Sequence, residues 1–365
     1  MKCVKCHADI KLKDRTQNLG KCKLCDHKFT FDPKLSDSFT DQFFAKTLSS
    51  LSVNNSLYFT PRQLYYFFNA RKYGAKLLWP GFMALGLAAF FAVFGPWPLS
   101  LLFAVAAIVL WLPAVRDQLR TKFPRQLKSE QQDIEQWVKR WEQNNGKVEK
   151  LLPPISPQSL PAKISAEVSA YSFDRAVICD HDEIARFLIA NNFHFENNCA
   201  VLSTNGYPSS IFSTVLEMLH RNPQLKVYAL HDASASGVQL VHRLRTTPRW
   251  FAESHGVTIF DLGLLPRQVM NRHMFVQQSE NFARQAQFLP EAVRQTLQSD
   301  ELKWLAEGKQ VELESLAPMT LLKLLRDGIA KSRMPETDDA LVVIDGGGYY
   351  GGSDGVSVYS VDSFG

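Results

Sequence analysis

Ala176-Val-Ile-Cys-Asp180 is the first of four short apolar runs that alternate with helical sequence patterns. The later runs are Ala200-Val-Leu-Ser203, Val227-Tyr-Ala-Leu-His-Asp232 and Val257-Thr-Ile-Phe-Asp261. Runs of this length that are rich in Val, Ile and Leu suit strands buried on both faces of a sheet. Between them, apolar residues recur at three- and four-residue spacing over 183–192, 209–221 and 237–245. Strands that alternate with amphipathic helices predict right-handed βαβ units and an α/β fold with a parallel sheet and flanking helices.

Asp180 and Asp232 stand at the ends of two of the predicted strands. Asp180 follows the first apolar run, and Asp232 follows the third. In open parallel sheets, ligands bind beyond the carboxyl ends of the strands. We therefore expect Asp180 and Asp232 to lie at the candidate site, side by side if their two strands are neighbours.

Length and composition set broad limits on the protein. With 365 residues there is room for two or three domains, and the 45% share of hydrophobic residues is ordinary for a folded protein. The net charge of +5 permits contact with nucleic acid or anionic lipid without requiring it. The chain opens with lysines and cysteines rather than an apolar core, so we expect no secretory signal.

Four of the six cysteines form two close pairs near the start of the chain. Cys3-Val-Lys-Cys6 and Cys22-Lys-Leu-Cys25 have the spacing of two metal-binding knuckles, which together supply the four thiolates that structural zinc prefers. We expect a zinc ribbon over residues 1–35, with structural Zn²⁺ bound by Cys3, Cys6, Cys22 and Cys25 in a reducing compartment.

Residues 77–115 contain no charged side chain. The prolines of Gly95-Pro-Trp-Pro98 divide this stretch into halves, each about long enough to span a bilayer. Basic residues flank both ends, so the positive-inside rule predicts a multi-pass transmembrane hairpin in the inner (cytoplasmic) membrane, with both termini cytoplasmic. The alternative is a buried hairpin in a soluble core.

Three short motifs carry a resemblance to a known family. Val177-Ile-Cys-Asp180, Thr204-Asn-Gly-Tyr-Pro208 and Asp232-Ala-Ser-Ala-Ser-Gly237 resemble motifs of the Toprim domain in the topoisomerase VI A subunit and its meiotic break-forming relatives. The segment Glu307-Gly-Lys-Gln-Val-Glu-Leu-Glu-Ser-Leu316 is similar to that family's closing elements. The resemblance implies a Toprim fold in which strand-end carboxylates hold Mg²⁺.

The resemblance implies that Asp180, Asp232 and Ser234 occupy the cofactor-binding positions. This sequence departs from the family pattern, because Asp180 stands in place of glutamate, Ser234 in place of the second aspartate and Asn205 in place of lysine. With two carboxylates instead of three, we expect weaker Mg²⁺ binding. The alternative is a vestigial site on a fold that serves as a scaffold.

A tyrosine pair is the second point of resemblance. Arg62-Gln-Leu-Tyr-Tyr66 is similar to the family motif whose second tyrosine attacks a DNA phosphate. The resemblance implies that Tyr66 is the nucleophile and that Arg62 stabilises the developing phosphate charge. The alternative is that these aromatic residues serve in packing or form an interfacial belt beside the membrane. Thr60 before Pro61, with Gln63 three residues later, predicts that a helix begins at Pro61.

Composition divides the rest of the chain. Leu152-Pro-Pro-Ile-Ser-Pro-Gln-Ser-Leu-Pro161 predicts a semi-rigid linker. The predicted organisation is a zinc ribbon at 1–35, a helical juxtamembrane segment at 36–76, the transmembrane hairpin at 77–115, a charged helix and proline-rich linker at 116–161, the Toprim-like domain at 162–332 and a glycine-rich flexible tail at 333–365.

Two functional hypotheses follow. The first is a membrane-anchored Toprim-like protein that binds or acts on DNA through a degenerate metal site, in a setting such as defence or plasmid handling. If active, it would be a Mg²⁺-dependent nuclease or a topoisomerase-like phosphodiester transferase. The second is a non-catalytic, membrane-associated protein whose Toprim fold and zinc ribbon bind a protein partner.

Overall fold

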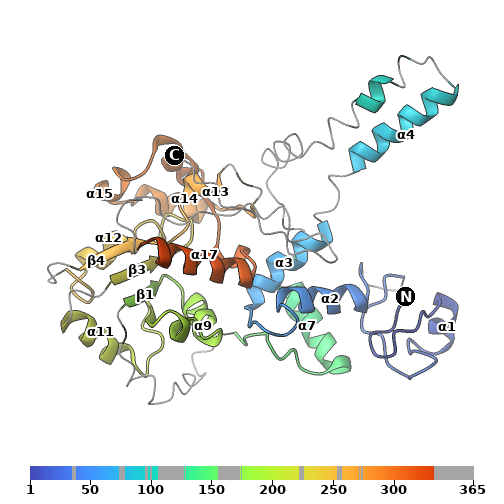
Figure 1. The fold of residues 1–365 in the computed structure, drawn as a ribbon, viewed down its shortest axis with the longest axis horizontal. Helices are drawn as coiled ribbons and strands as arrows, with labels where there is room; N and C mark the ends of the chain where they lie inside the picture. Colours follow the sequence, from blue (N-terminus) through green and yellow to red (C-terminus); the bar gives the residue numbers. More distant parts are fainter. Residues whose placement is uncertain are drawn as a thin grey trace.

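A computed structural model gives the fold of the chain (Figure 1). It describes residues 1–34, 38–73, 79–94, 98, 101–105, 127, 129–154, 173, 175–221, 226–252, 257–270, 272 and 274–332. The predicted glycine-rich tail, 333–365, lies outside the described residues, as does most of the predicted proline-rich linker.

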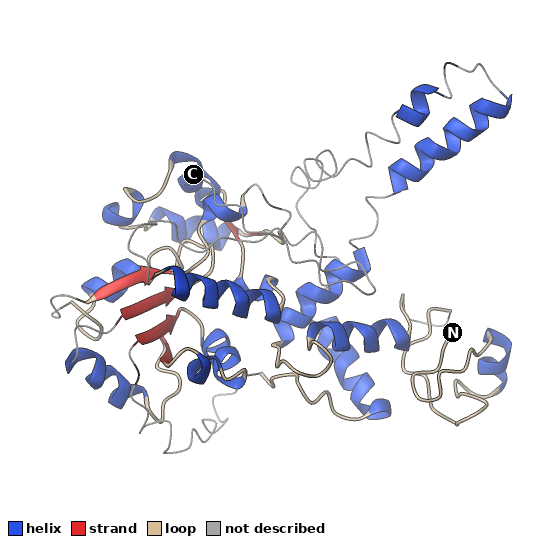
Figure 2. Cartoon of the chain, in the orientation of Figure 1, coloured by secondary structure: helices blue, strands red, loops and turns tan. Residues whose placement is uncertain are grey.

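A four-stranded parallel sheet forms the centre of the C-terminal half. Its strand order is β2-β1-β3-β4. The strands are β1 (Arg175–Cys179), β2 (Cys199–Ser203), β3 (Lys226–Leu230) and β4 (Thr258–Asp261). Figure 2 shows them in red among the surrounding helices. The predicted parallel sheet is confirmed, and its strands lie on the four apolar runs.

Alternate residues of each strand enter different cores, as the period of two in a β-strand requires. Val177, Val201 and Tyr228 pack with the leucines of α17 (Pro318–Lys331) and with α9 (Asp182–Ala190). Ala176 and Leu202 pack instead with α11 (Phe212–Arg221) and α12 (Leu240–Thr246) on the other face. Burial on both faces explains why the strands read as continuous apolar runs rather than as alternating patterns.

Helices follow each of the first three strands. They are α9 (Asp182–Ala190) and α10 (Phe193–Glu196) after β1, α11 (Phe212–Arg221) after β2 and α12 (Leu240–Thr246) after β3. The elements after β4 are α13 (Pro266–Val269), β5 (Gln277–Gln278), α14 (Glu280–Gln287), α15 (Glu291–Arg294), α16 (Ser299–Ala306), β6 (Lys309–Gln310), η2 (Leu313–Ser315) and α17 (Pro318–Lys331). Strands β5 and β6 pair in an antiparallel ribbon.

The N-terminal half contains a second, aromatic-rich core. The helices that form it are α2 (Asp41–Leu51), α3 (Pro61–Tyr73) and α7 (Gln131–Asn145). Helix α3 begins at Pro61 as predicted, with the Gln63 amide N–H donating to Thr60 Oγ1 at 3.1 Å and the Thr60 amide N–H donating to Gln63 Oε1 at 3.0 Å. The reciprocal bonds satisfy two donors that a helix start leaves unpaired.

The predicted transmembrane hairpin is contradicted by the described helices. Helix α4 (Trp79–Phe94) is apolar but has 16 residues, or ~24 Å at 1.5 Å per residue, against a hydrocarbon core of ~30 Å. None of the helices in the described part of the chain combines the length and apolar composition that a bilayer crossing requires. Of the predicted second half, only 101–105 lie among the described residues.

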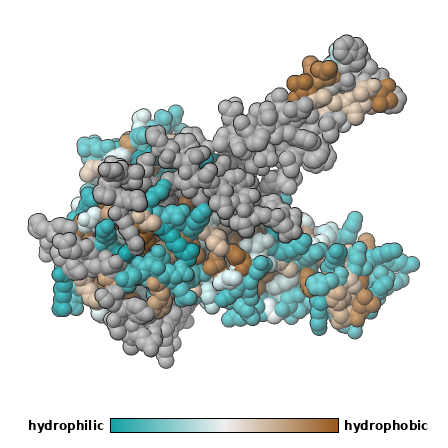
Figure 3. Space-filling view, in the orientation of Figure 1, coloured by the Kyte–Doolittle hydropathy of each residue, from teal (hydrophilic) through white to brown (hydrophobic). Residues whose placement is uncertain are grey.

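The prediction of a multi-pass protein in the inner membrane is therefore wrong for the described chain. An uncharged run reveals the apolar character of a segment but not where its helix ends, and here the first helix ends at Phe94. Leu87, Phe90 and Val93 of α4 are exposed, and Figure 3 shows hydrophobic atoms (brown) on this projecting helix.

A side-chain clip joins the N-terminal helices to the sheet domain. The buried Asn191 amide accepts a hydrogen bond from the Tyr58 backbone N–H at 2.8 Å and donates to the Tyr58 carbonyl at 3.1 Å. It also donates to the Phe187 carbonyl at 3.0 Å. Beside it, Phe59 and Leu151 form a parallel bridge. These contacts position the start of α3 against the sheet domain.

Asn191→Asp should destabilise the protein by about 1–3 kcal/mol, because the carboxylate cannot donate to the Tyr58 carbonyl, while the Phe187 carbonyl keeps only the Asn191 backbone N–H. The free energy of unfolding in urea measures this. Asn197→Asp is the control, since the Asn197 amide makes a single partly exposed bond to the Phe193 carbonyl. Equal losses in the two variants would show that Asn191 does not act as a clip.

Candidate functional site

The two predicted aspartates meet at the carboxyl edge of the sheet. Strands β1 and β3 are direct neighbours, with Cys179 opposite Leu230, so both strands end at the same edge of the sheet. The Asp232 backbone N–H donates to Asp180 Oδ2 at 3.0 Å. The expected adjacency of Asp180 and Asp232 is confirmed.

Asp180 presents an unpaired oxygen at this edge. Its side chain is 8% exposed, and Oδ1 is buried without a hydrogen-bond partner among the described residues. Burial and then the neighbouring Asp232 charge raise the pKa of Asp180 to about 6. A buried carboxylate with an open acceptor is stabilised by a cation, so the residues present fit a divalent metal ion.

His181 completes the group of ligand atoms. Its Nε2 lies 3.2 Å from Asp232 Oδ2 and 3.7 Å from Asp180 Oδ2. The hydrogen bond with Asp232 is the main cause that raises the pKa of His181, to about 10. One ligand atom from each of Asp180, His181 and Asp232 falls within 4.8 Å of the others, so the three could hold a metal ion.

Ser234, the third predicted position, is engaged in its own turn. Its Oγ accepts from the Gly237 N–H at 3.0 Å and lies 3.1 Å from Ser236 Oγ. Gly237 is required here, because a Cβ would lie 2.1 Å from the Asp232 carbonyl oxygen. The hydroxyl of Ser234 thus shapes the loop that carries Asp232, and its role toward a cation stays a prediction.

A buried histidine supports the same loop from behind. His231 Nδ1 lies 2.8 Å from the Asp232 carbonyl oxygen, and Nε2 lies 3.0 Å from Asp261 Oδ1. Burial alone would lower the pKa of His231, but the Asp261 carboxylate outweighs it and raises the pKa to about 9. Both ring nitrogens face oxygen atoms, an arrangement that favours the doubly protonated ring.

The predicted Arg62–Tyr66 pair meets at Glu312, which the sequence reasoning did not single out. The Arg62 guanidinium donates through Nε and Nη2 to the two Glu312 oxygens. The Tyr66 hydroxyl donates to Glu312 Oε2 at 2.8 Å and accepts from Gln277 Nε2 at 2.5 Å. Tyr66 is 1% exposed, and burial raises the pKa of its phenol.

A cavity of about 270 Å³ opens beside these groups. Two arginines, several carboxylates and His181 line it. The lining residues are Thr60, Pro61, Arg62, Gln131, Glu135, Leu152, Pro153, Pro154, His181, Glu183, Arg186, Asp232, Glu312 and Glu314. The N-terminal helices and the sheet domain together enclose the site.

Sequence reasoning found some of these residues and missed others. The strand-end pattern located Asp180 and Asp232, whereas His181, Glu312 and Glu314 were not singled out. His181 could have been found because it directly follows Asp180. The segment that contains Glu312 and Glu314 was recognised as similar to the family's closing elements, but no local pattern assigns either glutamate to this cavity.

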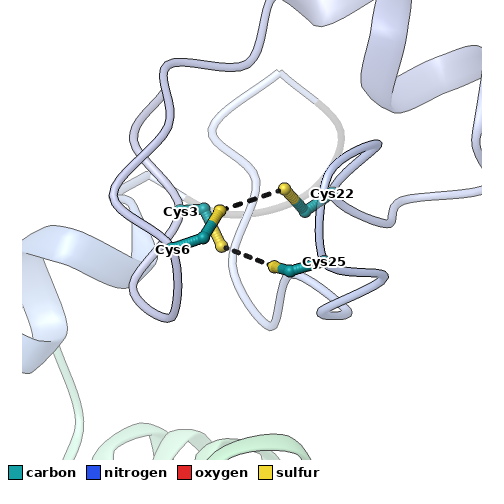
Figure 4. Close-up of side chains that lie close together, drawn as sticks. All are labelled: Cys3, Cys6, Cys22 and Cys25. Carbon is teal, nitrogen blue, oxygen red and sulfur yellow. Dashed lines mark hydrogen bonds between the residues drawn. The ribbon is translucent and has the colours of Figure 1, made fainter.

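The four N-terminal cysteines lie together as predicted (Figure 4). Cys3 Sγ is 3.7 Å from Cys25 Sγ, and Cys6 Sγ is 3.6 Å from Cys22 Sγ. Tetrahedral coordination with metal–sulfur bonds of ~2.3 Å would separate sulfurs by ~3.8 Å. Each knuckle is closed by one antiparallel bridge, and α1 (Leu12–Gln17) lies between the knuckles. The four thiols could therefore hold one metal ion.

Comparison with known proteins gives one partial likeness. No protein-family model matches the chain. The meiotic recombination protein spo-11 of Caenorhabditis elegans is 27% identical over 159 residues, which cover 39% of this chain and 37% of that protein. The chain therefore aligns with little more than a third of its relative, and the parallel sheet agrees with a Toprim-like fold.

The buried side chain of Glu314 predicts that the stability of the protein depends on pH. Burial is the main cause that raises its pKa from the usual 4.5 to about 7. The folded chain keeps this proton to higher pH than the unfolded chain does, so stability falls as pH rises from 4.5 to 7. Glu314→Gln cannot ionise and should raise the free energy of unfolding by roughly 1–3 kcal/mol at pH 8 but little at pH 5.

Thermal unfolding at the two pH values, without added Mg²⁺, measures this difference. Glu291→Gln on the exposed surface of α15 is the control and should show no such pH dependence. A Glu314→Gln effect of equal size at pH 5 and pH 8 would show that burial does not hold the proton on Glu314.

Proposed function

We propose that this protein hydrolyses phosphodiester bonds of DNA with a divalent cation held at the strand-end site. The observation that carries the proposal is the unpaired, buried Asp180 Oδ1 beside Asp232, at the carboxyl edge of a Toprim-like sheet. The likeness to a meiotic recombination protein supports DNA as the substrate. Membrane anchoring forms no part of this proposal.

Asp180 and Asp232 would hold the ion, and His181 would join them once the incoming cation displaces its proton; Mg²⁺ or Mn²⁺ suits this oxygen-rich ligand set. When bound, the cation supplies Lewis-acid stabilisation of charge on the phosphoryl oxygens. Arg62 and Arg186 line the same cavity and would orient a DNA phosphate there. The carboxylates around the cavity would repel an incoming phosphate without the cation, which makes activity depend on the metal.

The reaction consumes one water molecule. The water oxygen forms a new bond to phosphorus, and one phosphoester bond breaks. The departing sugar oxygen leaves as a hydroxyl group with a proton that derives from the water. No oxidant or reductant is needed. The residues of the chain bind the cation, and they orient the DNA phosphate and neutralise its charge.

Asp232→Asn and Asp180→Asn should each lower the rate of plasmid cleavage by about 100-fold or more, because losing metal charge stabilisation costs several kcal/mol. Nicking of supercoiled plasmid in Mg²⁺ or Mn²⁺ measures the rate. Asp300→Asn on the exposed start of α16 is the control and should match the wild type. If the wild-type protein shows no metal-dependent cleavage, the chain is a binding module and the enzyme proposal fails.

We propose further that the N-terminal cysteines bind structural zinc. The sulfur separations of 3.6 and 3.7 Å support tetrahedral coordination. The hydrophobic cluster of the described ribbon contains only a few buried residues, including Cys3, Ile10 and Phe29, so a metal would supply much of its stability.

Metal analysis of the purified protein should find about one zinc per chain, the content of a single four-cysteine site. Cys22→Ser should lose this zinc, while Cys199→Ala, which removes a buried thiol of β2 far along the chain, should keep it. Proteolysis should then cut the N-terminal 34 residues selectively in Cys22→Ser. Full zinc content in Cys22→Ser would rule out the predicted site.

A further inference from the structure

Glu312 lies between helix α3 and the loop that carries Asp232. Its side chain is 10% exposed and accepts charge-assisted hydrogen bonds from Arg62 through both oxygens. Tyr66, one turn further along α3, donates to the same carboxylate at 2.8 Å. Two side chains of one helix thus hold a single buried carboxylate, an arrangement that restricts its position strongly.

The backbone around Glu312 is joined to the metal-binding loop. Val311 and Ala233 form an antiparallel bridge with two backbone hydrogen bonds of 2.9 and 3.0 Å. The Leu313 N–H donates to Asp232 Oδ1 at 2.7 Å. The residues on either side of Glu312 therefore contact the Asp232 loop, while the Glu312 side chain contacts α3.

The Tyr66 hydroxyl is committed to this network. It donates to Glu312 and accepts from Gln277 Nε2, and its side chain is 1% exposed. Among the described residues that line the 270 Å³ cavity, Arg62 and Glu312 are present and Tyr66 is not. A phosphate in the cavity would meet Arg62 and Asp232 rather than the phenol oxygen.

We propose that Glu312 is a positioning residue that sets the Asp232 carboxylate for the divalent cation, and that Tyr66 acts through Glu312 rather than as the nucleophile. The path runs from the Tyr66 hydroxyl and Arg62 to the Glu312 carboxylate, along the backbone to the Leu313 N–H, and from there to Asp232 Oδ1. This inference rests on the proposed metal-dependent hydrolysis. Water supplies the attacking oxygen, with the bond changes given above.

We expect Glu312 to affect metal affinity because hydrogen-bonding partners fix the orientation of metal ligands. A carboxylate ligand that is hydrogen-bonded by a rigid partner loses less freedom when it binds a cation. Removing such partners lowers metal affinity by about 10- to 100-fold in other metal sites. Glu312→Gln keeps the shape of the side chain but weakens the hold of Arg62 and Tyr66, so segment 311–313 would no longer place the Leu313 N–H firmly.

The first measurement is the affinity of the full chain for Mn²⁺. It is obtained by calorimetric titration of protein that keeps zinc at its N-terminal cysteines. Glu312→Gln and Tyr66→Phe should each weaken Mn²⁺ binding, by about 10-fold or more for Glu312→Gln. Tyr65→Phe is the matched control, because the neighbouring Tyr65 has no hydroxyl contact with Glu312 among the described contacts and should bind Mn²⁺ as the wild type does. In the Glu312→Gln/Tyr66→Phe double variant, Tyr66→Phe should cause no further loss of Mn²⁺ affinity, since both changes act through the same carboxylate.

Thermal unfolding separates loss of positioning from loss of folding. If Glu312→Gln does not fold, Arg62→Lys takes its place, because lysine keeps the charge but cannot grip both Glu312 oxygens. Unchanged Mn²⁺ affinity in a folded Glu312→Gln or Arg62→Lys variant overturns the positioning role.

The second measurement identifies the nucleophile. Cleavage by Glu312→Gln and Tyr66→Phe should recover at high Mn²⁺ concentration, and denatured wild-type reactions should contain no protein joined covalently to DNA. A covalent adduct that disappears in Tyr66→Phe would overturn the inference and make Tyr66 the nucleophile. A wild-type protein that neither binds Mn²⁺ nor cleaves DNA overturns the proposed function and this inference with it.

Discussion

The parallel pairing of β1 with β3 is the constraint on which the site depends. It brings two carboxylates, Asp180 and Asp232, to one buried edge of the sheet, where like charges repel and burial disfavours both. The structure offsets this cost with donors and cations: the Asp232 amide faces Asp180, and His181 faces Asp232. Burial prevents water from screening these charges, so the surrounding groups must do so.

Support for Asp232 comes from three directions. His231 holds its carbonyl from behind while bonded to Asp261 on β4, and the close approach of Gly237 sets the turn in front. The Leu313 N–H holds its side chain from the C-terminal segment. These contacts restrict the loop, and such restriction reduces the ordering that a bound ion would require.

The sheet domain does not build the cavity alone. Helix α3 supplies Arg62 to one wall, where Thr60 directly precedes the helix, and its aromatic face packs into the N-terminal core beside Trp141 of α7. The Asn191 clip and the Arg62–Glu312 ion pair tie this helical layer to the sheet domain. Burial of the Tyr66 phenol follows from the same packing, because its ring lies against Phe275 while its hydroxyl contacts Glu312.

Much of the fold was predictable because its signals are local. Apolar runs gave the four strands, helical spacing gave α9, α11 and α12, and Thr60 with Gln63 gave the start of α3. The apolar stretch at 77–115 led to the wrong prediction of a transmembrane hairpin, because its composition is apolar throughout while the length of α4 falls short of a bilayer. The domain boundaries stay predictions, and so do the catalytic roles of Arg62 and Tyr66.

The sequence by itself determined which residues end the strands, where α3 begins and which cysteines share a site, because each depends on neighbours a few positions away or on fixed spacing. Only the tertiary structure decided that β1 pairs with β3, so that Asp180 meets Asp232. It also decided that Tyr66 contacts Glu312 across a separation of 246 residues. Contacts of that kind arise from the packing of whole helices and sheets, and no local pattern of residues encodes them.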